Sequence, residues 1–173
     1  MPYREFKQCV RYNVPGHAHS LTFSCYQYLP LLESTAAKQL VVDSLQAARA
    51  RHCFDIWAYV IMQEHVHLFI WPRKEIYDIS TMLAAIKRPV AFRARIMGLS
   101  GEKHFWQRGG GYDRNIWLPG AIHNEVAYLH GNPVRRGLCR NLEDWRYSSA
   151  GFWAGQRDVP LLMDETLPPK LKS

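Results

Sequence analysis

The most apolar part of the chain consists of two consecutive runs, residues 56–62 and residues 64–71. Both are rich in β-branched and aromatic residues, which predicts two buried strands joined by a tight turn at Gln63-Glu64. Alternate residues of a strand point to the same face, so His65 and His67 are expected side by side on one face. Neutral imidazole is the commonest metal ligand, and the pair therefore predicts a metal site that needs a third ligand from elsewhere. The alternative is that both histidines are structural.

Helical periodicity appears in three segments. Residues 31–51 carry one apolar stripe, which predicts a core helix. A second amphipathic helix is expected after Asp78, a suitable N-cap, and Pro89 should kink it or break it near Arg88. These two helices give one apolar layer for the strands.

The third helical segment begins at Pro119 and is expected to end at Pro133, just after Asn132. Its apolar stripe predicts core packing. Tyr128 and Asn132 are four residues apart and lie off that stripe, so they should share a face of the helix. A phenol and an amide are then available to something outside the helix.

Two further strands complete the expected sheet. Residues 17–26 alternate well enough for a first strand, in which His17 and His19 are expected to be structural or to face DNA; residues 98–120 suggest a glycine-rich loop and a short edge strand. The order β-α-β-β-α-β-α is that of an α+β ferredoxin-like, or RRM-like, antiparallel sheet with helices on one face. One domain over residues 1–173 is expected, with an N-terminal arm (1–16) and a loosely packed tail (156–173).

The charge distribution favours a nucleic-acid partner. The formal net charge is +7 and the isoelectric point is about 9.4. Residues 87–114 include seven cationic and only two acidic side chains. Interleaved aromatic residues suit a phosphate backbone with unstacked bases. The cations predicted to bind DNA are Lys87, Arg88, Arg93, Arg108, Arg114, Arg135 and Arg136.

Other compositional features narrow the cellular setting. The four cysteines form no CxxC pair, which favours free thiols. The apolar runs are too short to span a bilayer, so no membrane partner is expected. The N-terminus lacks the pattern of a signal peptide, which predicts a cytoplasmic protein associated with the nucleoid.

Three motifs resemble a known family. Residues 59–68, with the His-Val-His core, resemble the His-hydrophobe-His motif of the IS200/IS605-type single-tyrosine (HUH) transposases. Residues 128–138 look like the catalytic-tyrosine helix of their REP-associated tyrosine transposase branch, and residues 105–114 are similar to the segment that precedes this helix. The resemblance covers about residues 15–155. Gln63 departs from the pattern, because relatives often have proline there.

This resemblance implies a metal-dependent endonuclease and strand transferase that acts on single-stranded, hairpin-containing DNA. Tyr128 matches the nucleophile, which would form a 5′-phosphotyrosine, and Asn132 matches a third ligand beside His65 and His67. The bound ion would be Mg²⁺ or Mn²⁺. Glu64 and His130 are candidates for a supporting shell or a base.

Two other functions fit the same residues. One is a domesticated DNA- or RNA-binding protein of the same fold that does not cleave. The other is a small metal-dependent hydrolase with an unrelated substrate, which the basic aromatic segments disfavour. The resemblance leaves both a monomer and a homodimer open.

Overall fold

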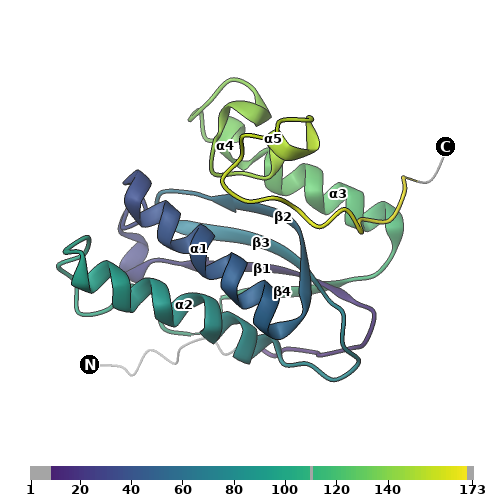
Figure 1. Ribbon diagram of the computed structural model, residues 1–173, viewed down its shortest axis with the longest axis horizontal. Helices are drawn as coiled ribbons and strands as arrows, with labels where there is room; N and C mark the ends of the chain where they lie inside the picture. The colour runs from purple at the N-terminus through teal and green to yellow at the C-terminus, as the bar shows by residue number, and fades with distance from the viewer. Residues whose placement is uncertain (1–8, 110, 171–173) are drawn as a thin grey trace, which may run out of the picture.

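The computed structural model describes residues 9–109 and 111–170, and its centre is a four-stranded antiparallel sheet (Figure 1). The strand order is β2-β3-β1-β4, with β1 at Ala18–Ser24, β2 at Phe54–Ile61, β3 at His65–Pro72 and β4 at Tyr112–Ile116. The helices are α1 (Thr35–His52), α2 (Ile79–Ile96), α3 (Pro119–His130), α4 (Asn132–Arg135) and α5 (Ala150–Trp153), with 3₁₀ turns η1 (Tyr26–Tyr28) and η2 (Leu142–Asp144). The predicted α+β ferredoxin-like class is confirmed.

Helices α1 and α2 cover one face of the sheet and form the larger core. On β3, Val66, Leu68 and Ile70 are fully buried in this core, as their alternation predicts. Helix α1 begins at Thr35, later than expected, because the Ser34 hydroxyl caps it by accepting a hydrogen bond from the Ala37 backbone N–H at 3.1 Å.

Of the two outcomes predicted for Pro89, a kink or a break near Arg88, the break is wrong, because α2 continues through Pro89 to Ile96. Proline removes one backbone donor from the helix interior. The Ser44 hydroxyl of α1 donates to the nearby carbonyl of Ile86 at 2.7 Å, and it lies 3.4 Å from the carbonyl of Ala85, which lacks its donor from Pro89. A tertiary hydrogen bond thus supports the helix where its own ladder is interrupted. The predicted Asp78 cap is confirmed, since its carboxylate accepts from the Ser80 and Thr81 backbone N–H groups.

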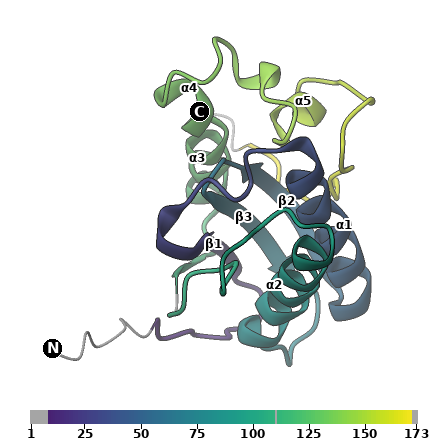
Figure 2. The same ribbon diagram turned by 90° about the vertical axis from the view of Figure 1, so that its left-hand side faces the viewer.

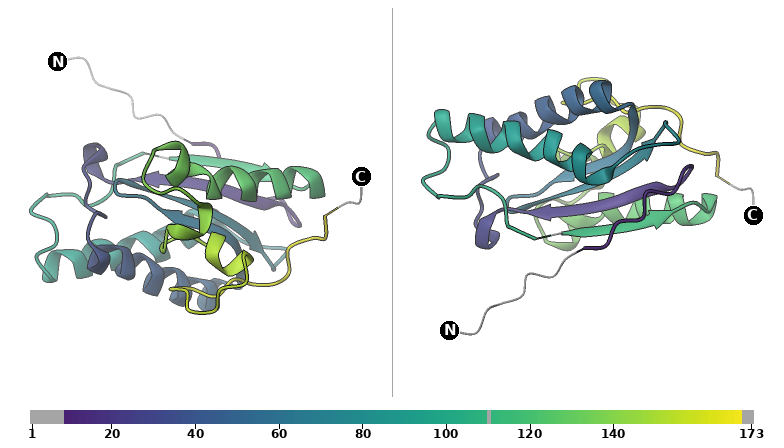
Figure 3. Two further views of the ribbon diagram at one scale, coloured as in Figure 1. Left: turned by 90° about the horizontal axis from the view of Figure 1, so that it is seen from above. Right: turned by 90° about the horizontal axis from the view of Figure 1, so that it is seen from below.

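The second face of the sheet is not bare, because α3 packs on it (Figures 2 and 3). Ile122, Val126 and Leu129 of α3 form a smaller apolar cluster with side chains of β2 such as Trp57 and Val60. The sheet therefore lies between two layers of helices. α3 leaves a cavity beside β1, β3 and β4, and this cavity belongs to the candidate site described below.

The third helix ends earlier than predicted. It stops at His130, Gly131 forms a turn, and Asn132 begins the short helix α4 instead of ending α3. Pro133 cannot donate a backbone hydrogen bond. The Asn132 side-chain amide instead donates to the carbonyls of Leu129 at 3.1 Å and Tyr128 at 3.3 Å. Asn132 is thus a cap on α3, one turn beyond Tyr128.

The C-terminal segment is not loosely packed, which corrects the prediction for residues 156–173 as far as residue 170. Leu161 and Met163 are buried in the core under α1. The Asp164 carboxylate accepts a hydrogen bond from the Ile56 backbone N–H at 2.9 Å and meets Arg49 at 3.1 Å. This segment therefore completes the edge of the sheet at β2. Of the predicted arm, residues 9–16 contain no helix or strand, and residues 1–8 lie outside the described residues.

Two smaller expectations concern cysteines and membranes. All four cysteines are free thiols. No helix in the described part of the chain has the length and hydropathy needed to cross a bilayer.

Candidate active site

His65 and His67 form a pair of imidazoles whose free nitrogens meet. Their Nε2 atoms lie 2.9 Å apart. The Nδ1 atom of His65 lies 3.0 Å from a Glu64 carboxylate oxygen, and Nδ1 of His67 lies 2.9 Å from the Thr22 hydroxyl of β1. Thr22 pairs with His67 in the strand register, which fixes this second contact. Each ring is therefore held from behind while its other nitrogen points to a shared position.

The hydrogen-bond partner at Nδ1 determines the tautomer of His65 but leaves that of His67 open. The Glu64 carboxylate only accepts hydrogen bonds, so Nδ1 of His65 carries the proton and its Nε2 presents a lone pair. The Thr22 hydroxyl can donate or accept, so it satisfies either tautomer of His67. Without an ion, Nε2 of His67 donates to His65. With an ion, both nitrogens can present lone pairs to it.

The environment keeps both imidazoles neutral near pH 7. Burial, and then the charges of His65 and Arg135, lower the pKa of His67 to about 4. Burial also lowers the pKa of His65, against the opposing effect of Glu64. Burial alone would raise the pKa of Glu64, but contacts with Arg136 and His65 hold it below its ordinary value. Neutral imidazoles and an ionised carboxylate behind one of them are the states that metal binding requires.

The donor set fits a divalent cation. At metal–nitrogen distances of about 2.1 Å, two adjacent ligands at right angles lie about 3.0 Å apart, which matches the separation of the two Nε2 atoms. Among the described residues, no group of three or more His, Cys, Asp or Glu side chains could hold a metal. A third protein ligand from the described residues would therefore be another kind of donor, such as an amide oxygen.

Asn132 is such a donor, although the structure places it without a hydrogen bond to either histidine. Its Nδ2 group caps α3, which turns its carbonyl oxygen away from the helix. That oxygen has no hydrogen-bond donor among the residues that the structure describes. The amide oxygen is available to a hard cation, but its role as a ligand stays a prediction.

Tyr128 and His67 line the same cavity. The cavity has a volume of about 580 Å³, and Tyr128 is 55% exposed at its wall. The Arg135 guanidinium lies 4.6 Å from the centre of the Tyr128 ring and donates to the Tyr128 carbonyl at 2.6 Å. A Cβ atom at Gly131 would collide with this guanidinium, so glycine leaves the space that Arg135 occupies. The structure thus brings the predicted nucleophile, one predicted ligand and a predicted DNA-binding cation into one neighbourhood.

A buried polar network also lines this cavity, and the sequence prediction missed it. Glu125 of α3 accepts hydrogen bonds from the Ser20 hydroxyl at 2.5 Å and from the Arg114 guanidinium at 2.6 Å. Glu125 is only 7% exposed, whereas half of the Arg114 side chain remains accessible. Arg114 is therefore a fixed cation beside Tyr128. The available signal was spacing, because Glu125 precedes Tyr128 by three residues and shares its helix face.

Several predicted residues lie apart from this centre. His130 is buried against the Ser149 hydroxyl at 2.8 Å, and burial lowers its pKa to about 4. It contacts neither histidine of the pair, and its surroundings are those of a structural residue. His19 is likewise enclosed, between Asp113 and Tyr77 at 2.8 Å each. Arg93 pairs with Asp43 at 3.6 Å, on the outer side of α2.

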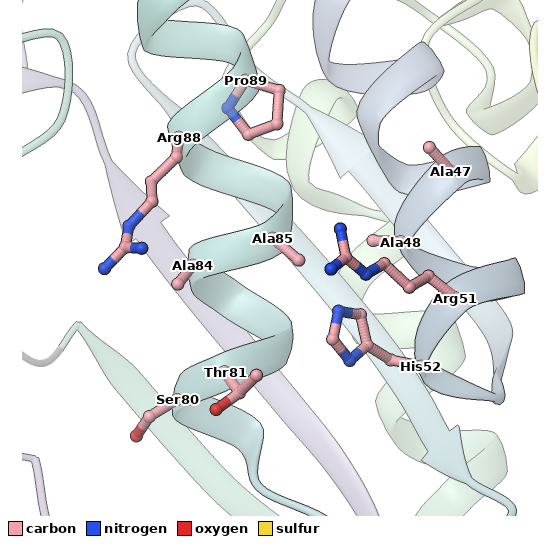
Figure 4. A pocket seen from close by; sticks show the side chains of 10 residues that line it. All are labelled: Ala47, Ala48, Arg51, His52, Ser80, Thr81, Ala84, Ala85, Arg88 and Pro89. Atoms are coloured by element: carbon pink, nitrogen blue, oxygen red, sulfur yellow. The ribbon is translucent and has the colours of Figure 1, made fainter.

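A different cavity lies between α1 and α2, on the far side of the sheet (Figure 4). Its volume is about 620 Å³, and four of its ten lining residues are alanines. Arg51 and His52 point from α1 toward α2, whereas Arg88 points away from α1. It contains neither the tyrosine nor the histidine pair, so it is not the candidate site.

Comparison with solved structures shows that other proteins share this fold. The chain is similar to a REP-associated tyrosine transposase solved bound to a REP hairpin, with a TM-score of 0.73 and 21% identity over 96% of this chain and 99% of that one. It is also similar to a candidate transposase from Deinococcus radiodurans, with a TM-score of 0.50 and 16% identity over 73% of this chain and 96% of the other. At these identities the likeness establishes the fold.

No family model matches the chain, and no curated protein matches it. The fold that the motif resemblance implied is thereby confirmed by structure alone.

Proposed function

We propose that this protein is a tyrosine transposase of the REP-associated type, which cleaves and transfers single-stranded DNA next to a hairpin with a divalent metal ion. The observation that carries the proposal is the combination of two convergent imidazole nitrogens 2.9 Å apart with Tyr128 in the cavity that His67 lines. The shared fold with two proteins described as transposases supports it.

The proposed ligands of the metal are His65, His67 and the amide oxygen of Asn132. A nitrogen and amide set suits Mn²⁺ at least as well as Mg²⁺. When bound, the ion supplies Lewis-acid polarisation of the scissile phosphate. Glu64 and Thr22 orient the two rings from behind through hydrogen bonds to Nδ1, and Arg136 holds the Glu64 carboxylate in turn.

The nucleophile in this proposal is the phenolic oxygen of Tyr128. It attacks phosphorus as the bond to the 3′-oxygen breaks; the phenol loses its proton and the leaving 3′-hydroxyl gains one. The products are a 5′-phosphotyrosine and a free 3′-hydroxyl, and reversal of the step by another 3′-hydroxyl joins strands without an external energy source. Arg135, which lies over the Tyr128 ring, and Arg114, which lines the same cavity as Tyr128, supply positive charge and are suited to bind the non-bridging phosphate oxygens.

The wider DNA contact is proposed to use the remaining predicted cations. Lys87, Arg88 and Arg108 surround one cavity, whereas Arg136 is already paired with Glu64 and Arg93 with Asp43. A basic DNA-handling protein of this kind is expected in the cytoplasm, at the nucleoid. The resemblance leaves both a monomer and a homodimer open.

The decisive experiment is adduct formation. Labelled single-stranded hairpin DNA is incubated with the protein and Mn²⁺, and covalent protein–DNA species are separated under denaturing conditions. We expect an adduct that needs the metal and is lost in Tyr128→Phe, while DNA affinity and melting temperature remain unchanged because Tyr128 is more than half exposed.

The same variant separates the alternatives. An adduct formed equally well by Tyr128→Phe would show that another residue is the nucleophile. A wild-type protein that binds hairpin DNA but never forms an adduct would be a non-cleaving binding protein of this fold. Metal-dependent hydrolysis that is unaffected in Tyr128→Phe would point to a small hydrolase.

A further inference from the structure

A second basic cavity lies on the opposite face of β1 from Tyr128. Its volume is about 770 Å³, and it lies between α2, the end of β1 and the segment that precedes β4. Thr22 lines the Tyr128 cavity and Phe23, the next residue, lines this one, because consecutive residues of a strand point to opposite faces. The β1–β4 ladder ends at the pair Thr22–Tyr112, so both cavities adjoin the same end of β4.

The lining of this cavity carries an excess of positive charge over the acidic side chains of the described residues. Four cations line it and no acidic side chain of the described residues does: Arg11, Lys87, Arg88 and Arg108. Arg11 lies 3.6 Å from Asp113, but no carboxylate among the residues that the structure describes comes within ion-pair distance of the other three. Clustered like charges repel each other, and a bound anion relieves that repulsion.

Lys87 is the anchor of this cavity. Its ammonium lies over the rings of Phe23 and Trp106, at 5.8 Å and 5.9 Å from their centres. The Trp106 indole N–H donates to the Lys87 carbonyl at 2.8 Å, which fixes the tryptophan against α2. Burial, and then the charge of Arg11, lower the pKa of Lys87. The side chain is thus a half-buried cation on an aromatic floor, without a protein counter-charge in the described residues.

The remaining cations extend this charge toward the rim. Arg88 is exposed on the side of α2 that faces away from α1, as Figure 4 shows, together with Ala84 and Ser80. Arg108 is exposed on the segment before β4. One sheltered ammonium with two exposed guanidiniums around it suits a chain of phosphates better than a single small anion, because the charges are spread along two elements.

We propose that this cavity binds the phosphodiester backbone of the single strand that flanks the scissile phosphate. The inference rests on the proposed function and adds a second strand-binding site on the other face of the sheet. The two cavities lie on the two sides of one sheet and adjoin the same end of β4, so one single strand can contact both. A strand that leaves the Tyr128 cavity reaches Lys87 by passing the end of β4.

The test asks whether one side chain of this cavity and one phosphate of the DNA flank contact each other. Hairpin DNA with a single-stranded flank is prepared with an uncharged methylphosphonate at each flank position in turn, and binding is measured by fluorescence anisotropy over a range of salt. The variants are Lys87→Gln and Arg108→Gln. Their charge-matched controls are Lys74→Gln and Arg51→Gln, which remove a cation away from this cavity.

We expect Lys87→Gln to weaken binding of the flanked substrate about fivefold at 0.1 M salt and to reduce the salt slope by about 0.7, the value for one contact to a single strand. One or two methylphosphonates should weaken wild-type binding by a similar factor and have no further effect in Lys87→Gln. Arg108→Gln, which removes an exposed side chain, should give the same pattern at a neighbouring phosphate, and the controls should resemble wild type.

Three results would overturn the inference. They are equal weakening in the controls, additive effects of Lys87→Gln and every methylphosphonate, or equal weakening on hairpins with and without the flank. Melting temperatures identify a variant that is merely misfolded, in which case Arg108→Gln decides. The proposed function is tested separately and would be contradicted by the absence of a Tyr128 adduct in the wild-type protein. That outcome would not affect the interpretation of the binding measurements with methylphosphonate DNA.

Discussion

The two faces of β3 differ in burial and in the kind of side chain that they carry. On one face Val66, Leu68 and Ile70 are completely buried under α1 and α2. On the other face His65 and His67 are only partly buried, beside a water-accessible cavity and a helix that carries Tyr128. The same strand thus contributes stability through Val66, Leu68 and Ile70 and, in the proposed function, chemistry through His65 and His67.

This difference explains how a small domain tolerates a polar centre. The apolar face keeps the backbone of β3 fixed, so the two rings can be held by only one hydrogen bond each at Nδ1. A site built on a rigid strand is more precise than one on a loop. Substitutions on the two faces should therefore affect different measurements.

The largest effect is expected from His67→Ala. If His67 is a ligand of the Lewis-acid ion, as proposed, its removal should cost about 4 kcal/mol of transition-state stabilisation, or about a thousandfold in cleavage rate. Single-turnover cleavage of labelled hairpin DNA with Mn²⁺ measures this, with the melting temperature as the control for folding. Cleavage within tenfold of wild type would mean that the histidine pair is structural.

The neighbouring residue should behave in the opposite way. Leu68→Ala empties space in the large core and should lower the free energy of unfolding by about 2–5 kcal/mol. Chemical denaturation measures the loss, and cleavage at a low temperature, where the variant is folded, should stay close to wild type. A large loss of cleavage in the folded variant would show that the two faces are not independent.

His130 tests whether every histidine on the α3 side belongs to the chemistry. Its pKa is about 4 in the folded protein against 6.5 for an ordinary histidine, because burial disfavours the charged form. The unfolded chain takes up this proton first as the pH falls. The contribution of neutral His130 to the free energy of unfolding is therefore fully present above pH 6.5. It is lost progressively down to pH 4, by about 3 kcal/mol in total.

His130→Asn should remove this part of the pH dependence. Denaturation curves of wild type and variant across that range measure the difference, while cleavage at pH 7.5 should change little. A variant with unchanged pH dependence would mean that His130 is not the titrating group. A variant that binds metal more weakly would mean that His130 belongs to the active site.

The smallest effect is expected at Glu64. Glu64→Gln keeps the shape of the side chain but removes the charge behind His65, and partners of this kind typically contribute 10–100-fold to metal affinity. Titration with Mn²⁺ measures the change. Asp43→Asn is the matched control, since it removes an exposed carboxylate that also pairs with an arginine. Equal metal affinities of the Glu64 and Asp43 variants would argue against a supporting role for Glu64.

Local sequence patterns determined much of this molecule. The alternation along β3, the Asp78 cap and the apolar stripes of α1 and α2 were predictable because each depends on residues a few positions apart. The placement of His65 and His67 side by side on one face of β3 was predictable for the same reason. The order of the elements also followed from these patterns, and the motif resemblance added the identities of the proposed nucleophile and of the third proposed ligand.

Tertiary structure decided the rest. Glu125 meets Ser20 across 105 residues, and Trp57 meets Thr166 across 109, so no local pattern contains them. The same holds for α2, which continues past Pro89, where the Ser44 hydroxyl of α1 lies 3.4 Å from the Ala85 carbonyl that Pro89 leaves without its helix donor. Periodicity fixes which face a side chain occupies, but only the packing of distant segments decides what covers that face.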